Sequence, residues 1–212
     1  MTNFIPLFPL ALVAYPGEKL NLHIFEPRYK QLITDCVLGS KPFGIIPVIN
    51  NKLMEIGTTV TVTNIVKTYD DGKMDISTLG GDVFNILAPV EKIPNKQYNG
   101  AIVNYPNNNY NGKPHLMQQL IETMQQLHKL VAVTKAFKKP LHDLNCYDIA
   151  HHLGLPLQNE YELLTLLHEP QRQEYLRLHL VKIIDTVTEI ENLKTKVRLN
   201  GHFKSLKGFD FE

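Results

Sequence analysis

The spacing of hydrophobic and polar positions divides the chain into two parts with different periods. Up to about Tyr105, short apolar runs and alternating segments predict β-strands. FGIIPVI is typical of a buried strand, and TTVTVT alternates with a period of two, which places Val60 and Val62 on one face. Ile65 and Val66 break this alternation, so we expect a β-bulge or a strand end at that point.

Turn signals separate the predicted strands. Asp71 and Gly72 form a dipeptide that is a strong signal for a β-hairpin. VFNIL and GAIVNY supply further strands after this turn. Several short strands at such spacing favour a small antiparallel β-barrel or a sandwich over a parallel sheet.

One helix is predicted inside the β-rich part, directly after HIFE. Pro27 suits the first helical turn, and the carboxylate of Glu26 suits the positive end of the helix dipole. Gly39 is placed to end the helix. We expect this helix to cover an open face or end of the barrel with one apolar stripe. The stripe consists of Tyr29, Leu32, Ile33, Cys36 and Val37.

The Asn-rich segment YPNNNYNGKP, residues 105–114, marks the boundary after which the period becomes helical. We expect one long amphipathic helix that Pro140 stops, and two short helices, NCYDIAHHLGL and NEYELLTLLHE, that Gly154 and Pro170 end. A final long helix is expected to leave one seam exposed. The stripe of the first long helix is Leu116, Leu120, Met124, Leu127 and Val131, and that of the last is Leu176, Leu180, Ile183, Val187 and Ile190.

These patterns predict an α+β fold. It consists of an antiparallel β-barrel with one inserted helix over residues 1–110, an α-helical bundle over residues 111–202, and a C-terminal tail over residues 203–212.

Composition gives no electrostatic reason to expect nucleic acid or an anionic membrane as a partner, because the formal net charge is only +1. Cys36 and Cys146 lack metal-site or disulfide-framework spacing, so we expect buried free thiols in a reducing compartment.

The apolar start lacks a preceding Lys or Arg and is interrupted by Pro6 and Pro9, which argues against a signal peptide. No later apolar segment is long enough to span a bilayer, and we expect a cytoplasmic protein.

Motifs that carry chemistry are missing from the sequence. It contains no phosphate-binding P-loop, no H-E-x-x-H and no G-x-S-x-G. His151 and His152 are adjacent, so on a helix their rings would diverge by about 100° and would not share a metal ion. Asp143 suits a loop or a cap, and the place of Cys36 on an apolar stripe favours packing over reactivity. We therefore expect no enzyme, no metal and no cofactor.

The first third of the chain, IPLFPLALVAYPGEKLNLHIFEPRYKQLITDC, resembles the start of the N-terminal substrate-binding domain of Lon proteases. The shared features are the phrase PLFPL, then Pro16-Gly17, then an apolar strand that leads into Phe-Glu-Pro-Arg-Tyr. The resemblance covers nearly the whole chain and implies a PUA-like β-barrel followed by a helical bundle. Val83 stands where the family usually has Arg, and Glu174-Tyr175-Leu176 stands where Glu-Arg-Leu is usual.

The resemblance implies a non-catalytic module that binds polypeptide segments, or a protease or adaptor, and that stands alone without the ATPase and peptidase domains of a Lon protease. Candidate contact residues are Glu26, Arg28, Tyr29 and Tyr69. The alternative interpretation is that the first three are scaffold, since Tyr29 belongs to the apolar stripe and Arg28 can pair with a carboxylate.

Two other functions and one further feature stay open at this point. RNA binding is an alternative through the PUA-like fold, with a lysine cluster near the end of one helix. A small ligand between barrel and bundle is the other alternative. Phenylalanines in the C-terminal tail are expected to dock on the chain's own barrel or to be disordered, and docking on a neighbouring molecule is the alternative. The lysines are Lys129, Lys135, Lys138 and Lys139, and the phenylalanines are Phe203, Phe209 and Phe211.

Overall fold

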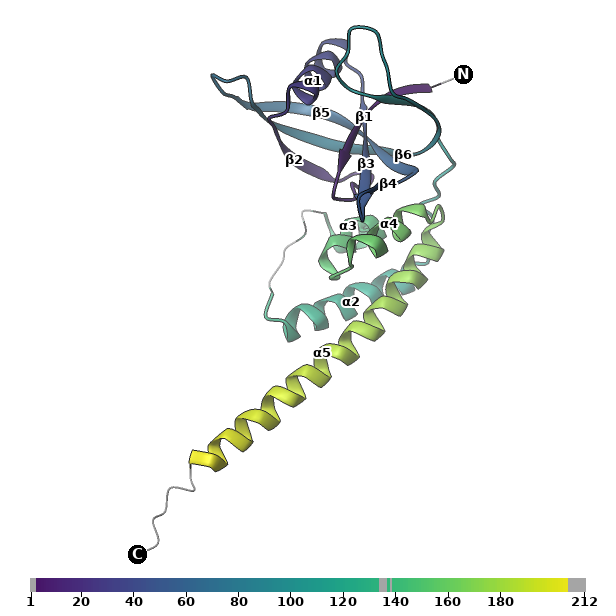
Figure 1. The fold of residues 1–212 in the computed structure, drawn as a ribbon. Coiled ribbons are helices and arrows are strands. Elements are labelled where there is room, and N and C mark those ends of the chain that lie inside the picture. The colour runs from purple at the N-terminus through teal and green to yellow at the C-terminus, as the bar shows by residue number, and fades with distance from the viewer. Residues whose placement is uncertain (1–2, 134–136, 138, 206–212) are drawn as a thin grey trace, which may run out of the picture.

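The computed structural model describes residues 3–133, 137 and 139–205 (Figure 1). A β-rich part comes first and a helical part follows it, as the change of period predicts. The strands are β1 (Asn3–Leu10), β2 (Lys19–Ile24), β3 (Phe43–Ile49), β4 (Lys52–Leu53), β5 (Ile56–Thr68), β6 (Met74–Val90) and β7 (Gly100–Asn104).

Five of the strands form a closed ring. The order is β1–β7–β6–β5–β3, and β3 pairs with β1 again. β2 lies outside this ring and pairs with β6. The pairs are antiparallel, as expected, except for β1–β3, which is parallel because β2 and the helix after it supply the long crossover that a parallel pair requires. The predicted α+β class is confirmed.

The longest hairpin joins β5 and β6. Gly72 has a φ of 75°, in the left-handed region, which favours glycine at this turn. Register shifts between Thr58 and Val60, between Val62 and Asn64, and between Ile65 and Lys67 confirm the irregularity that the sequence predicts in this strand.

The inserted helix α1 (Pro27–Gly39) begins and ends at the predicted residues, and Ser40 in the left-handed region completes its C-terminus. Tyr29 and the next three positions of the stripe are buried against the barrel, but Val37 is 39% exposed. Glu26 forms no side-chain cap, because its carboxylate pairs with Arg28 instead.

The helical part differs from the prediction at two helix ends. The first long helix ends at Leu130 and not at Pro140, since the chain turns at Ala132, whose φ is 53°. The helix expected to end at Pro170 ends at Thr165, and Pro170 lies in the first turn of the next helix, where its missing N–H costs little. The elements are α2 (Pro114–Leu130), η1 (Leu141–Asp143), α3 (Cys146–Ile149), η2 (Ala150–His152), α4 (Leu157–Thr165) and α5 (Glu169–Ser205).

The hydrophobic core crosses the boundary between the two parts. Val13, Tyr15 and Val83 of the β-rich part belong to the same buried cluster as the helical side chains. A second cluster lies between α1 and the barrel. Val83, which stands where the resemblance leads one to expect Arg, is 1% exposed and contributes apolar contact to this junction.

The long helix α5 is covered only along its first part. Leu176 and Leu180 are buried, whereas Ile190, Leu193 and Val197 are between 46% and 69% exposed. Figure 1 shows the C-terminal part of α5 extending away from the other elements. The exposed seam expected on this helix is therefore present. Within the described ranges, no helix is both long and apolar enough to cross a bilayer.

Candidate functional site

Three of the four contact residues expected from the sequence lie together at the start of α1. The guanidinium of Arg28 lies 2.7 Å from the carboxylate of Glu26 and 4.5 Å from the ring centroid of Tyr29. The Tyr29 ring is buried and packs against Phe8 at a centroid distance of 4.1 Å. Burial raises the pKa of Tyr29. These contacts support the scaffold interpretation, because each side chain is engaged by its neighbours.

Tyr69 belongs to a different group of side chains near the β5–β6 turn. Its hydroxyl donates to Asp75 at 2.7 Å, and the ammonium of Lys67 lies 4.3 Å from its ring centroid. The ring of His23 bonds the same carboxylate at 2.6 Å. Among the residues described, no hydrogen bond, ion pair or ring contact joins Tyr69 to the three residues at the start of α1.

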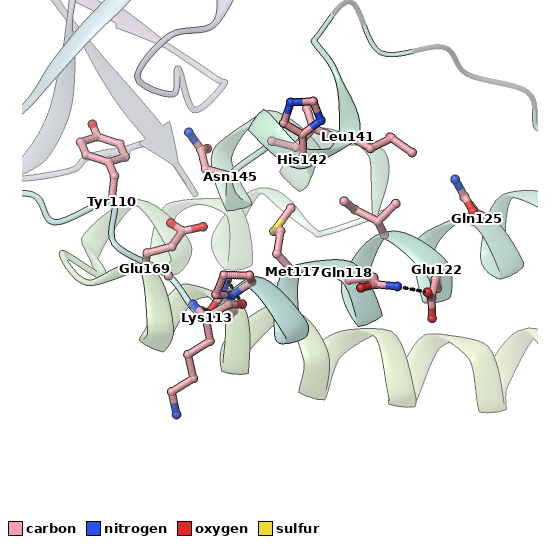
Figure 2. Close-up of a pocket in the computed structure, with 15 residues that line it drawn as sticks. Tyr110, Lys113, Met117, Gln118, Glu122, Gln125, Leu141, His142, Asn145 and Glu169 are labelled. Carbon is pink, nitrogen blue, oxygen red and sulfur yellow. Dashed lines mark hydrogen bonds between the residues drawn. The ribbon is translucent and has the colours of Figure 1, made fainter.

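The helical part contains an open pocket that sequence reasoning did not find (Figure 2). It has a volume of about 600 Å³ and lies between α2, the η1 segment, the start of α3 and the first turns of α5. Figure 2 shows Leu141 and His142 across from α2, with Met117 between them and the Lys113 end of the helix. Apolar contact surface comes from Met117, Ile121, Leu141 and Leu144.

One wall of the pocket is fixed by main-chain contacts. The side-chain amide of Gln173 accepts from the Lys113 N–H at 2.9 Å and donates to the Lys113 carbonyl at 3.2 Å. Gly112 packs so closely that a Cβ there would lie 2.6 Å from Gln173 and 2.7 Å from Glu169. The segment before α2 is thereby held against α5.

A buried ion pair supports the same wall. Arg172 is 0% exposed, and its Nε lies 2.7 Å from the carboxylate of Glu169, which also accepts from the Cys146 N–H at 2.8 Å. Arg172 further donates to Asn108, to the Tyr147 hydroxyl and to the carbonyl oxygens of residues 109 and 166. A buried charge of this kind is tolerated because its hydrogen-bonding capacity is filled.

The rim of the pocket carries polar side chains. Gln118 donates to Glu122 at 3.0 Å along α2, as the dashed line in Figure 2 shows. Gln125 and Asn145 also line the pocket, and Lys113 extends away from it. An apolar floor with amide groups at its rim can hold an apolar side chain while the rim bonds the polar groups around it.

The sequence offered no signal for this pocket because it depends on where α2 ends. A helix that continued to Pro140 would carry the chain past the position at which Leu141 and Leu144 face α2. Instead, the chain turns after Leu130 and returns across the helix. The turning residue, Ala132, is neither glycine nor proline, so its left-handed backbone has no local sequence signature.

A second cavity, of about 810 Å³, lies at the junction of barrel and helices. His151 projects there between two carboxylates, with Nδ1 2.7 Å from Glu160 and Nε2 3.3 Å from Glu18. Burial opposes protonation of the ring, but the hydrogen bonds and charges of Glu160 and Glu18 outweigh it and raise the pKa of His151 to about 9. The ring also packs on Tyr15 at a centroid distance of 4.8 Å.

The remaining candidates for chemistry are accounted for by packing. Cys36 and Cys146 are buried free thiols, as expected, and burial raises the pKa of each, that of Cys36 to about 11. A thiol of high pKa carries little thiolate and reacts slowly. Across the described ranges, no cluster of three His, Cys, Asp or Glu side chains could hold a metal ion, and no buried side-chain polar atom lacks a partner.

The lysine cluster considered for RNA is only partly visible. Lys135 and Lys138 lie outside the described residues, and Lys139 pairs with Asp148 at 2.5 Å. The expected docking of Phe203, Phe209 and Phe211 also falls on positions whose side chains lie outside the described part of the chain.

A closed sheet joined through a shared hydrophobic cluster to a short helical array defines a domain of mixed α and β class. The chain belongs to the family described as the ATP-dependent protease La (LON) substrate-binding domain, whose model matches residues 5–195. This confirms the resemblance seen in the sequence.

Two solved structures share the fold. The Lon N-terminal domain protein from Xanthomonas campestris is 23% identical, with a TM-score of 0.63, and the match covers 83% of this chain and 98% of that chain. The N-terminal domain of Lon protease from the Mycobacterium avium complex is 13% identical, with a TM-score of 0.63, and the match covers 84% of this chain and 98% of that chain. At these identities the likeness shows the fold alone.

Proposed function

We propose that the chain binds segments of other polypeptides without a chemical step, and that the pocket beside α2 receives an apolar side chain of the bound segment. The observation that supports the proposal most strongly is this pocket of about 600 Å³ in a domain of the substrate-binding family. The cytoplasmic location stays a prediction from the sequence.

The dimensions and chemistry of the pocket suit such a ligand. A volume of several hundred Å³ lined by Met117, Ile121 and Leu144 accepts an aromatic or branched side chain. Methionine adapts its shape to different side chains, which suits a site that binds more than one sequence. Because the wall around Gln173 is fixed by hydrogen bonds, binding there requires little ordering of the protein.

A direct test uses reduced, carboxymethylated α-lactalbumin, an unfolded protein, as a labelled probe in fluorescence anisotropy. We expect the chain to bind this probe and not the folded, disulfide-intact form, since only the unfolded form presents apolar segments. Leu141→Asp places a charge in the pocket, so we expect binding to weaken about fivefold or more. Leu141 is 47% exposed, which makes the variant compatible with folding.

The matched control is Leu130→Asp. Leu130 is 42% exposed at the end of α2 but does not line the pocket, so we expect unchanged affinity. Equal losses in the two variants would overturn the assignment to this pocket. Failure of the unmodified chain to bind the unfolded probe would overturn the function itself, and tight binding of a single-stranded RNA at low salt in its place would favour the RNA alternative.

A further inference from the structure

The outer half of β5 has an unpaired edge. β5 pairs with β6 over its whole length, whereas β3 covers its other side only at Thr58, Thr59 and Val60. From Thr61 onward, no strand in the described part of the chain pairs with that side. Main-chain N–H and C=O groups on such an edge form a template for one more strand.

A groove of about 500 Å³ runs between this edge and the end of α1. Val62 and Ile65 on the strand and Val37 on the helix give it apolar walls, and Ile65 and Val37 are 40% and 39% exposed. Ile65 pairs with the buried Ile76, so the inner face of the sheet continues into the groove. The lining residues are Cys36, Val37, Ser40, Lys41, Thr61, Val62, Thr63, Asn64 and Ile65.

The charge that lines the groove is positive. Lys41 is the only charged residue that lines it among the residues described, whereas Lys67, further along the same strand, lies opposite Asp75 of β6. The carbonyl oxygens at the end of α1 are already bonded, since Ser40 N–H donates to Val37 and Lys41 N–H donates to Cys36. An acidic side chain on a bound segment would therefore meet a cation, whereas a basic one would meet repulsion.

We propose that this groove binds an extended polypeptide segment, with apolar side chains at alternating positions and acidic residues at its ends, as an additional strand on β5. The proposal rests on the proposed function and deepens it, because it states the conformation and charge of the bound polypeptide. Main-chain hydrogen bonds would supply affinity, and the alternate side chains would cover Val37, Val62 and Ile65.

The geometry favours a separate segment over a second copy of this chain. Register shifts at Val62/Asn64 and Ile65/Lys67 make the edge irregular, and irregular edges oppose the regular pairing of two equal strands. A short flexible segment can follow the irregular edge and supply the opposite charge.

The first experiment uses an eight-residue peptide that alternates valine and threonine and has glutamate at both ends. In a strand only alternate N–H groups face the neighbouring strand, so two N-methylated forms are compared, one with methyl groups on odd positions and one on even positions. We expect one form to lose about tenfold or more in affinity and the other to bind like the parent. Equal losses, or none, would overturn strand addition.

The second experiment uses two matched pairs of charge variants. Val37→Asp and Ile65→Asp place an anion in the groove, whereas Leu38→Asp and Val66→Asp place one on neighbouring exposed positions that do not line it. We expect the groove variants to lose about tenfold in affinity for the peptide and the controls to keep it. All four sites are at least 39% exposed, and circular dichroism verifies that each variant is folded.

The outcomes separate this proposal from the proposed function. If unfolded α-lactalbumin binds and the peptide does not, the groove proposal fails while the function stands. If the same peptide with lysine at both ends binds as tightly as the glutamate form, the charge assignment is wrong. If the chain self-associates at the concentrations used and Ile65→Asp abolishes only that self-association, the occupant is a second copy and the proposal is overturned.

Discussion

Arg172 is fully buried, and the pocket wall beside it depends on the bonds that its guanidinium makes to Glu169, Asn108 and Tyr147. The sequence around it, EPQRQEY, is mostly polar and is typical of an exposed helix start. Polar residues of this kind are buried only where partners distant in sequence supply their hydrogen bonds, and Asn108 lies far earlier in the chain. No local pattern could therefore have identified this residue.

Arg172→Ala should be strongly destabilising, because it leaves the Glu169 carboxylate buried without its cation. We expect the free energy of unfolding to fall by about 3–5 kcal/mol, measured by urea titration. Arg177→Ala is the control, since its ion pair with Glu174 is exposed and little change is expected. Comparable losses in both variants would show that the buried pair has no special importance.

Secondary-structure elements were predictable where their ends have local signals. Pro27 and Gly39 mark α1 by backbone chemistry alone, and the Gly72 turn marks the β5–β6 hairpin. The end of α2 at Leu130 was missed because the turn uses Ala132 in the left-handed region, and alanine gives no local signal for such a turn. The pocket of Figure 2 was missed with it, since its far wall follows that turn.

Two leucines on α5 test which part of this helix contributes to the stability of the fold. Leu180 is 1% exposed in the shared core, whereas Leu193 is 60% exposed on the projecting part. Leu180→Ala should lower the free energy of unfolding by about 2–5 kcal/mol through cavity formation. Leu193→Ala should change it by no more than about 0.5 kcal/mol, unless the projecting part has a partner in solution. Urea titration at two protein concentrations measures both effects.

At the scale of the whole molecule, the two parts predicted from the change in period share one hydrophobic cluster and one polar junction. The α+β class and the order of the parts followed from periodicity. The parallel contact of β1 with β3 and the ion triad of His151 did not, because both join segments that are distant in sequence. Contacts between segments that are distant in sequence do not change the hydrophobic periodicity, so they cannot be predicted from it.

The His151 junction should make stability depend on pH. The pKa of His151 is raised from 6.5 to about 9 in the folded chain, so its protonated form stabilises the fold fully below about pH 6.5. This contribution is lost as pH rises through about 9. We expect the free energy of unfolding of the wild type to exceed that of His151→Gln by about 1 kcal/mol at pH 6, a value that partial solvent exposure reduces. Near pH 10 we expect the two free energies to be equal.

Urea titrations across this range measure the difference, with His142→Gln as the control. The His142 side chain is 81% exposed, and we expect that variant to follow the wild-type pH dependence. A constant difference between wild type and His151→Gln at every pH would contradict the role assigned to the protonated ring.

The closed ring of strands has a consequence for biosynthesis. β1 pairs on one side with β7, where Asn3 lies opposite Val103. The ring can therefore close only after β7, the last strand to be synthesised, is available to pair with β1, the first. During translation, the apolar segments of β1 and β3 have left the ribosome while β7 is still absent. Contacts between such distant segments form slowly, and the nascent chain is exposed to aggregation in that interval. The domain, which we propose binds unfolded polypeptides, thus passes through a comparable state itself.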